Sequence, residues 1–166
     1  MPYMWYVNAS TYQQSTDTYY GLLNYFPGKE GYTSDQQLFV STFSTGSMYY
    51  TKIVPSAEVK QPVAVQFLGY SEAAKELYFA GMYANSSTAI VGTLDLNGQV
   101  KNVLWEKTAS AVGPLVVDDA SKVVTVYTED TENKKWSLWS LSQKKLKESL
   151  VKEYKVNDHL KVFAAA

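Results

Sequence analysis

The sequence predicts an all-β domain, built as an antiparallel meander of short strands with internal repeats. Two observations support this prediction. Short apolar segments rich in β-branched and aromatic residues alternate with polar turns along the chain, and apolar positions recur at a regular spacing in its second half. Runs of this length that end in turn residues are strands more often than helices.

The clearest strands lie between residues 63 and 142. Apolar segments alternate there with turn residues, at 63–70, 75–83, 87–98, 99–107, 113–119, 122–130 and 134–142. The runs 123–127 and 89–94 are apolar on both faces, apart from Thr93. A strand with one face in water alternates apolar and polar residues, so we expect both faces of these two strands to be covered.

The first fifty residues contain few charged side chains and are dense in Tyr, Ser, Thr, Gln and Asn. We expect strands at 5–7 and 18–26, and a hairpin that joins 38–43 to 48–54 around the turn 44–46. The N-terminal third therefore continues the pattern of strands and turns, with a less charged surface.

The second half of the chain repeats itself at a spacing of 47 residues. The matched pairs are Lys75 with Lys122, Leu77 with Val124, Phe79 with Val126, Val91 with Leu138, and Leu94 with Leu141. At a spacing of 46, Val100 and Leu104 match Leu146 and Leu150. Looser matches extend backwards: Leu77 with Leu38 at 39, Val100 and Leu104 with Val59 and Val63 at 41, and Tyr49–Tyr50 with Tyr19–Tyr20 at 30.

A period of about 40 to 47 residues, with room for four short strands in each unit, resembles the blade repeat of β-propellers in general. The resemblance covers residues 38–154 and points to no specific family, since the chain has neither a Trp-Asp blade signature nor an Asp-box. It implies a propeller-like set of four-stranded meanders. A β-sandwich or a β-barrel is the alternative for the same strand pattern.

The segment 142–154 is compatible with two structures. Leu146, Leu150 and Tyr154 recur at the four-residue spacing of a helix, behind Ser142 as a candidate cap. The repeat favours an outer strand instead, and a lysine-rich outer strand protects the edge of a sheet from association. We therefore predict a strand. Residues 1–163 form one all-β domain in this interpretation, and the alanines 164–166 are an artificial tail.

Composition excludes several kinds of site. The chain has no Cys and no Arg, a single His, and 15 basic against 16 acidic residues, for a net charge of −1. Thiolate metal sites are excluded, and neither a basic surface nor an arginine fork is present for nucleic acid. We expect no cofactor, no nucleic-acid partner and no membrane partner. Without an apolar run long enough to span a bilayer, and without a signal peptide, we expect a soluble chain of undetermined compartment.

No catalytic motif stands out. The acidic clusters 118–119 and 129–132 lie at opposite ends of one strand, about 30 Å apart at 3.3 Å per residue, so one active site cannot use both. His159 follows Asp158, but neighbours on a strand point to opposite faces, and we expect a structural or surface role. No serine elbow and no glycine-rich phosphate loop occurs. We therefore predict that the protein is not an enzyme.

Aromatic side chains with a polar edge are the best candidates for ligand contact, because they stack on sugars and anchor protein partners. In each of the doublets 19–20 and 49–50, one tyrosine must face each side of its sheet. The candidate ligand-binding residues are Tyr19, Tyr20, Tyr49, Tyr50, Trp105, Trp136 and Trp139.

These observations favour a non-enzymatic binding module for a carbohydrate or a peptide, with aromatic-lined loops. The first alternative is a structural, self-assembling unit, a partial propeller completed by another copy in a homo-oligomer. The second is a barrel that binds a small hydrophobic ligand. An exposed tyrosine or tryptophan beside neutral polar groups would favour the binding module.

Overall fold

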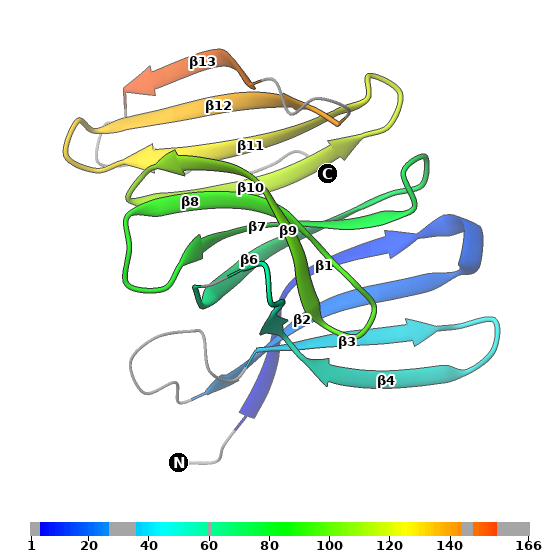
Figure 1. Cartoon of the computed structure of the whole chain (residues 1–166). Coiled ribbons are helices and arrows are strands. Elements are labelled where there is room, and N and C mark those ends of the chain that lie inside the picture. Colours follow the sequence, from blue (N-terminus) through cyan, green and yellow to red (C-terminus); the bar gives the residue numbers. More distant parts are fainter. Residues whose placement is uncertain (1–3, 27–35, 60, 144–147, 156–166) are drawn as a thin grey trace.

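Antiparallel strands make up most of the chain (Figure 1). The computed structural model describes residues 4–26, 36–59, 61–143 and 148–155. Within these residues thirteen strands form three sheets, named A, B and C in chain order. The predicted all-β antiparallel meander is confirmed.

Each sheet is a meander in which strands adjacent in sequence pair with each other. Sheet A contains β1 (Met4–Gln13), β2 (Thr18–Phe26), β3 (Gln37–Thr42) and β4 (Ser47–Lys52). Sheet B contains β6 (Val63–Ser71), β7 (Glu76–Tyr83), β8 (Thr88–Leu94) and β9 (Gln99–Thr108), and the short β5 (Val54–Pro55) pairs in parallel with β9. Sheet C contains β10 (Ala111–Asp118), β11 (Val123–Asp130), β12 (Lys135–Ser142) and β13 (Glu148–Lys155).

The three sheets are stacked in chain order, with sheet B between the other two (Figure 1). The first strands of the meanders are neighbours, since β6 contacts β1 on one side and β10 on the other. Three four-stranded meanders with adjacent first strands form a propeller-like arrangement rather than a two-layer sandwich or a closed barrel.

Two hydrophobic cores separate the sheets. The core between sheets A and B includes Leu22, Leu38 and Phe79, and the core between sheets B and C includes Val124 and Leu141. All five side chains are buried. The central strand β8 is buried on both faces, as expected. For 123–127 the expectation holds fully for one face only: Val124 and Val126 are buried, whereas the residues of the other face are half-buried, because sheet C is the last described sheet of the stack.

The spacing of 47 residues is confirmed by the turn that joins the first two strands of each sheet. One residue of each turn has a positive φ: Asp17 (55°) in sheet A, Lys75 (54°) in sheet B and Lys122 (57°) in sheet C. The looser matches toward the N-terminus were wrong, because they join strands that hold different positions in their sheets or, at Val59, a residue outside any strand. The equivalent of Leu77 in sheet A is Tyr19, not Leu38. The connection between sheets A and B is longer than that between sheets B and C, so the spacing changes there and the repeat is hard to see in the sequence.

The prediction of a strand rather than a helix near the C-terminus is confirmed by β13, which forms the outer edge of sheet C. Strand β5 was not predicted. His159, Leu146 and the tail 164–166 lie outside the described residues.

Acidic side chains link the turns of neighbouring sheets. Glu72, in the β6–β7 turn, accepts hydrogen bonds from the hydroxyl (2.7 Å) and the backbone N–H (2.9 Å) of Ser15 in the β1–β2 turn. These two bonds lower the pKa of Glu72 to about 2. Asp119, in the β10–β11 turn, accepts from the N–H groups of Glu72 (2.7 Å) and Ala73 (3.2 Å) and from the Ser71 hydroxyl. An acidic turn residue thus fastens each later sheet to the sheet before it.

A glutamine connects sheet A to β6, the edge strand of sheet B. The Gln36 side chain donates from Nε2 to the Val65 carbonyl (2.7 Å), and its Oε1 accepts from the Val65 N–H (2.9 Å). Both residues are buried. Because the carboxamide offers a donor and an acceptor together, it satisfies the strand edge much as a neighbouring strand would.

Candidate functional site

A cleft of about 580 Å³ lies between sheets A and B, at the end where the β1–β2 and β6–β7 turns meet. Its volume falls within the range of about 300 to 1,000 Å³ that is common for small-molecule sites. Both sheets and their turns line it: Gln13, Thr16, Thr18, Tyr20, Val40, Thr42 and Tyr49 on the side of sheet A, and Tyr70, Lys75, Glu76, Leu77, Leu94, Asp95, Leu96 and Lys101 on the side of sheet B.

Three tyrosines form the aromatic part of the cleft. The rings of Tyr20 and Tyr70 are stacked, with centroids 5.6 Å apart and an angle of 12° between their planes. The Tyr20 hydroxyl donates to Gln13 Oε1 at 2.7 Å, which fixes the glutamine beside the stack. Tyr49, on β4, is 40% exposed, and its hydroxyl donates to the Leu96 carbonyl of the β8–β9 turn at 3.3 Å.

Hydroxyl groups of sheet A line one side of the cleft. Thr16 Oγ1 donates to Thr18 Oγ1 at 2.9 Å, and Thr18 Oγ1 lies 3.0 Å from Thr42 Oγ1. Each hydroxyl is both a donor and an acceptor, so this group adapts its hydrogen bonds to either kind of partner. The cleft therefore presents neutral polar groups beside its rings.

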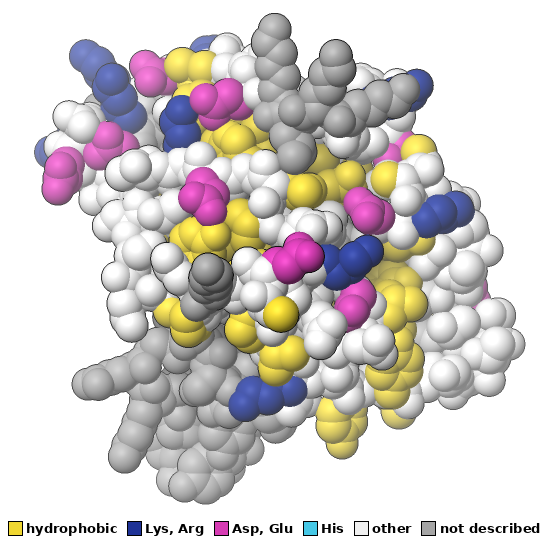
Figure 2. Space-filling model, viewed as in Figure 1, with side chains coloured by type: hydrophobic (Ala, Val, Ile, Leu, Met, Phe, Trp, Pro, Cys, Tyr) yellow, Lys and Arg dark blue, Asp and Glu magenta, His cyan; other side chains and the backbone are white. Residues whose placement is uncertain are grey.

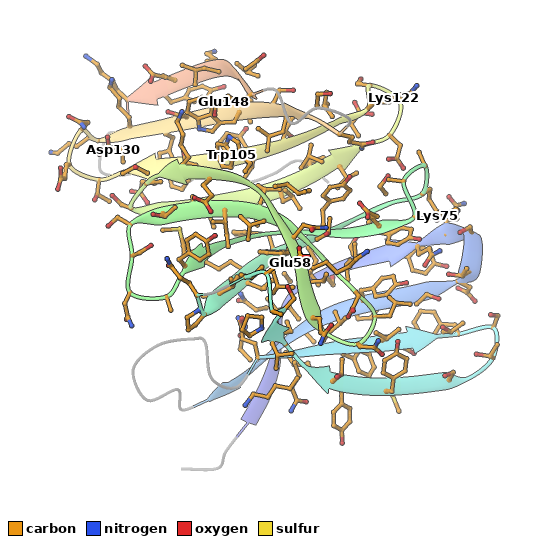
Figure 3. All side chains as sticks on the ribbon, viewed as in Figure 1. Glu58, Lys75, Trp105, Lys122, Asp130 and Glu148 are labelled. Carbon is orange, nitrogen blue, oxygen red and sulfur yellow. The ribbon has the colours of Figure 1, made fainter. Side chains whose placement is uncertain are left out.

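The charged groups of the cleft balance each other. Lys75 Nζ lies 3.0 Å from Glu72 Oε2, and Lys101 Nζ lies 4.0 Å from Glu76 Oε1. Asp95 Oδ1 accepts from backbone N–H groups within its own turn, at 2.8 and 2.9 Å. The figure with all side chains shows Lys75 at the turn end of the molecule, on the same side as Lys122 (Figure 3). No single sign of charge dominates the site.

Burial keeps the tyrosine hydroxyls protonated. It raises the pKa of Tyr20 to about 12, with smaller contributions from the neighbouring Tyr70 and Tyr49. The pKa values of Tyr49 and Tyr70 are also raised, first by burial and then by the charges of Asp95 and Glu72 respectively. At neutral pH these groups are hydrogen-bonding hydroxyls rather than nucleophiles.

No protein-family model matches the chain, and no curated protein matches it. Among solved structures, the crystal structure of a protein from Lactobacillus plantarum, a structural genomics target, is similar with a TM-score of 0.46 and 9% sequence identity. The similarity covers 93% of this chain and 57% of that chain. The chain therefore spans less than two thirds of the length of that protein.

The structure divides the seven predicted aromatic residues among four places. Tyr20 and Tyr49 line the cleft. Their neighbours Tyr19 and Tyr50 lie on the opposite face of sheet A, where Tyr19 meets Phe39 edge-on with centroids 6.2 Å apart. The doublets thus point to both faces, as predicted.

The tryptophans lie in and beyond the interface of sheets B and C. Trp105 is 7% exposed and meets Trp139 with ring centroids 5.9 Å apart. The Trp105 indole donates to Glu148 Oε2 at 2.7 Å, and Figure 3 shows these two side chains close together. The indole of Trp139 donates to Thr128 Oγ1 at 2.9 Å. Trp136 lies on the outer face of sheet C, over Gly113.

Sequence reasoning missed Tyr70, Gln13 and the threonines of the cleft. Tyr70 is a single aromatic residue at the end of an apolar strand, and its role depends on the stack with Tyr20 from another sheet. Gln13 ends β1 and is buried, but nothing in the sequence around it indicates that burial. Only the packing of sheet A on sheet B brings these residues together.

A second, smaller cleft of about 370 Å³ lies beside β9 and includes Glu58, Tyr83 and Glu106. The Tyr83 hydroxyl donates to Glu106 Oε1 at 2.6 Å, so these two polar groups pair with each other. The described part of the chain contains no cluster of three His, Cys, Asp or Glu side chains able to hold a metal ion. Nor does it contain a helix long and apolar enough to cross a membrane.

Proposed function

We propose that the protein binds a neutral, hydroxyl-rich ligand, of the carbohydrate class, in the cleft between sheets A and B, without converting it chemically. One observation carries this proposal: the stacked pair Tyr20–Tyr70 and the exposed Tyr49 share a cleft with a group of threonine hydroxyls. An apolar surface beside a few well-placed hydrogen-bonding groups is the usual composition of small-molecule sites.

Sugars match this composition in two ways. A pyranose ring has an apolar face of C–H groups, which packs on the face of a tyrosine ring, and Tyr49 is the most accessible ring of the cleft. Its edge carries hydroxyls that donate and accept, and Thr18 and Thr42 offer the complementary groups. The balanced charges of Lys101 and Glu76 favour a neutral ligand over a phosphate or a carboxylate.

Binding without chemistry is supported by the state of the polar groups. The raised pKa of Tyr20 leaves its hydroxyl a poor nucleophile at neutral pH. The carboxylate of Glu76 is paired with Lys101. A pair of free carboxylates on the two sides of a bound sugar, which glycoside hydrolysis requires, is not formed by the described residues of this cleft.

The test is a glycan array, followed by calorimetry with the sugars that bind. Tyr49→Ala should weaken binding about tenfold, which corresponds to about 1.4 kcal/mol for a lost ring contact. The matched control is Tyr50→Ala, which removes the adjacent tyrosine on the opposite face of sheet A and should leave the affinity unchanged. Tryptophan fluorescence is not suited to measure binding in this cleft, because Trp105 and Trp139 lie in the interface between sheets B and C.

The proposal fails if no sugar binds at millimolar concentration, or if Tyr49→Ala and Tyr50→Ala weaken binding equally. Capture of peptides in a parallel peptide array, with no sugar bound, would assign the cleft to a different ligand class and would also overturn it. Circular dichroism of each variant distinguishes lost contacts from lost folding.

A further inference from the structure

In the described part of the chain, each of the two outermost sheets has one face that no other sheet covers. Aligning the sheets at Asp17, Lys75 and Lys122 places Tyr19 of sheet A at the position of Leu77 in sheet B and of Val124 in sheet C. Leu77 packs toward sheet A, and Val124 packs toward sheet B. Tyr19 therefore lies on the face that, in the other two sheets, packs against the preceding sheet. In sheet A no described sheet covers it.

The outer face of sheet A is apolar and aromatic. Tyr19, Phe39 and Tyr50 lie next to one another across β2, β3 and β4, and Met48 and Tyr50 are each 68% exposed. Figure 2 shows hydrophobic side chains projecting at the lower edge of the view, where β3 and β4 lie in Figure 1. Contiguous exposed apolar surface of this kind marks an interaction site.

The outer face of sheet C corresponds to the face that, in sheets A and B, packs against the following sheet. Tyr127 of β11 is at the position of Ala80 in sheet B, which packs toward the following sheet. Tyr127 pairs with Leu138, and Glu129 with Trp136, so Trp136 and Leu138 share this face. Tyr154 lies beside Trp136 on β13. Sheet C thus has a half-buried aromatic face at the position where, in sheets A and B, the following sheet packs.

We propose that the outer face of sheet A binds the outer face of sheet C of a second copy of this chain, so that two chains join head to tail into one ring of six sheets. The contact continues the order already present, in which each later sheet packs on the one before it. Three sheets are too few to close a propeller, whereas six lie within the range of four to eight. Head-to-tail contacts close into a ring when the rotation between units permits.

The charges in the turns are also compatible with a second copy of this chain as the partner. Glu72 and Asp119 reach back to the turn of the preceding sheet, and the equivalent residue of sheet A is the neutral Gln14. In the dimer Gln14 would meet the β10–β11 turn, whose Asp118 already accepts from the N–H groups of Ala120 (3.0 Å) and Ser121 (3.1 Å). An acid at position 14 would be repelled by Asp118, whereas a carboxamide donates to it.

The first experiment is sedimentation equilibrium of the whole chain at several concentrations. The expected mass is twice the 18.6 kDa of one chain. Tyr50→Ala and Trp136→Ala should each raise the dissociation constant at least tenfold, because each damages both contacts of the ring. Tyr49→Ala, which alters the cleft and not the outer face, is the control and should leave the dimer intact.

Mixing the two variants tests the head-to-tail geometry. A dimer of one Tyr50→Ala chain and one Trp136→Ala chain has one contact with both changes and one contact with neither, so the mixture should associate more tightly than either variant alone. Gln14→Glu should weaken the dimer and Gln14→Lys should not.

Three outcomes would overturn the proposal: a monomer at every concentration, a dimer that Trp136→Ala leaves unchanged, or open chains larger than a dimer. A monomer would indicate that the two faces bind sheets of another chain, or of a longer form of this one. Ligand binding is measured separately with the Tyr49→Ala variant, so each proposal can fail without the other.

Discussion

Sheet B makes two interfaces, and they differ although the same repeat builds both. Toward sheet C, Trp105 and Trp139 pack together and the core is continuous. Toward sheet A, the core ends at the stacked rings of Tyr20 and Tyr70, and the interface opens into the cleft. Among the described residues, the interface toward sheet C is filled by a continuous core, and the cleft lies in the interface toward sheet A.

Equivalent residues of the first strands explain part of this difference. Gly69 of β6 faces β10, and a Cβ atom there would lie 2.7 Å from Val117 Cγ2. The corresponding residue of β1 is Thr11, also two positions before the end of its strand, and its hydroxyl accepts from the Tyr70 N–H at 3.1 Å. Glycine permits sheets B and C to approach closely, whereas a threonine and a tyrosine occupy the corresponding place between sheets A and B. The residue type at this repeat position is therefore one difference between the two interfaces.

The largest effect is expected from the cores beneath the two interfaces. Phe79 and Val126 are equivalent residues of sheets B and C, and both are fully buried. Phe79→Ala should lower the free energy of unfolding by about 3 to 5 kcal/mol, because it leaves a large cavity between sheets A and B. Val126→Ala removes far less volume and should cost about 2 kcal/mol. Urea denaturation measures both, and equal costs would show that the core under the cleft is loosely packed.

The second largest effect on stability is expected from substitutions at Gly69 and Thr11. Gly69→Ala should destabilise the protein by about 1 to 3 kcal/mol, because the new methyl group overpacks the contact with Val117. Thr11→Ala should cost about 1 kcal/mol, through the loss of one hydrogen bond to Tyr70. A Gly69→Ala variant as stable as the parent would contradict close approach as the reason for the closed interface. Thermal unfolding of the two variants side by side provides the comparison.

The smallest effect concerns the acidic link between sheets A and B. The pKa of Glu72 falls from 4.5 to about 2 on folding, because the carboxylate accepts hydrogen bonds from Ser15. Its contribution to stability is therefore complete above pH 4.5 and is lost as the pH falls toward 2. Glu72→Gln should flatten the loss of stability over that range while leaving stability near pH 7 slightly lower. Denaturation curves at several acidic pH values test this, and an unchanged slope would be evidence against the link.

Much of the fold was predictable because local patterns determine it. The strands from Val63 to Ser142 matched their apolar segments, and the spacing of Lys75 and Lys122 marked equivalent turns. The position of a sheet in the stack is not a local property, so the sequence did not indicate that one face of β11 is only half-buried. The cleft depends on the same long-range packing: the doublets predicted Tyr20 and Tyr49, but nothing near Tyr70 in the sequence indicates that its ring meets Tyr20.

The bond between Gln36 and Val65 makes one amide proton a reporter for the docking of sheet A. The Val65 N–H belongs to an edge strand, and its acceptor is a side chain of another sheet. That proton exchanges with solvent deuterium only when Gln36 moves away, so its exchange rate measures how often the two sheets separate. A ligand that spans the cleft would hold the sheets together and slow the exchange of this proton, at a place it does not touch.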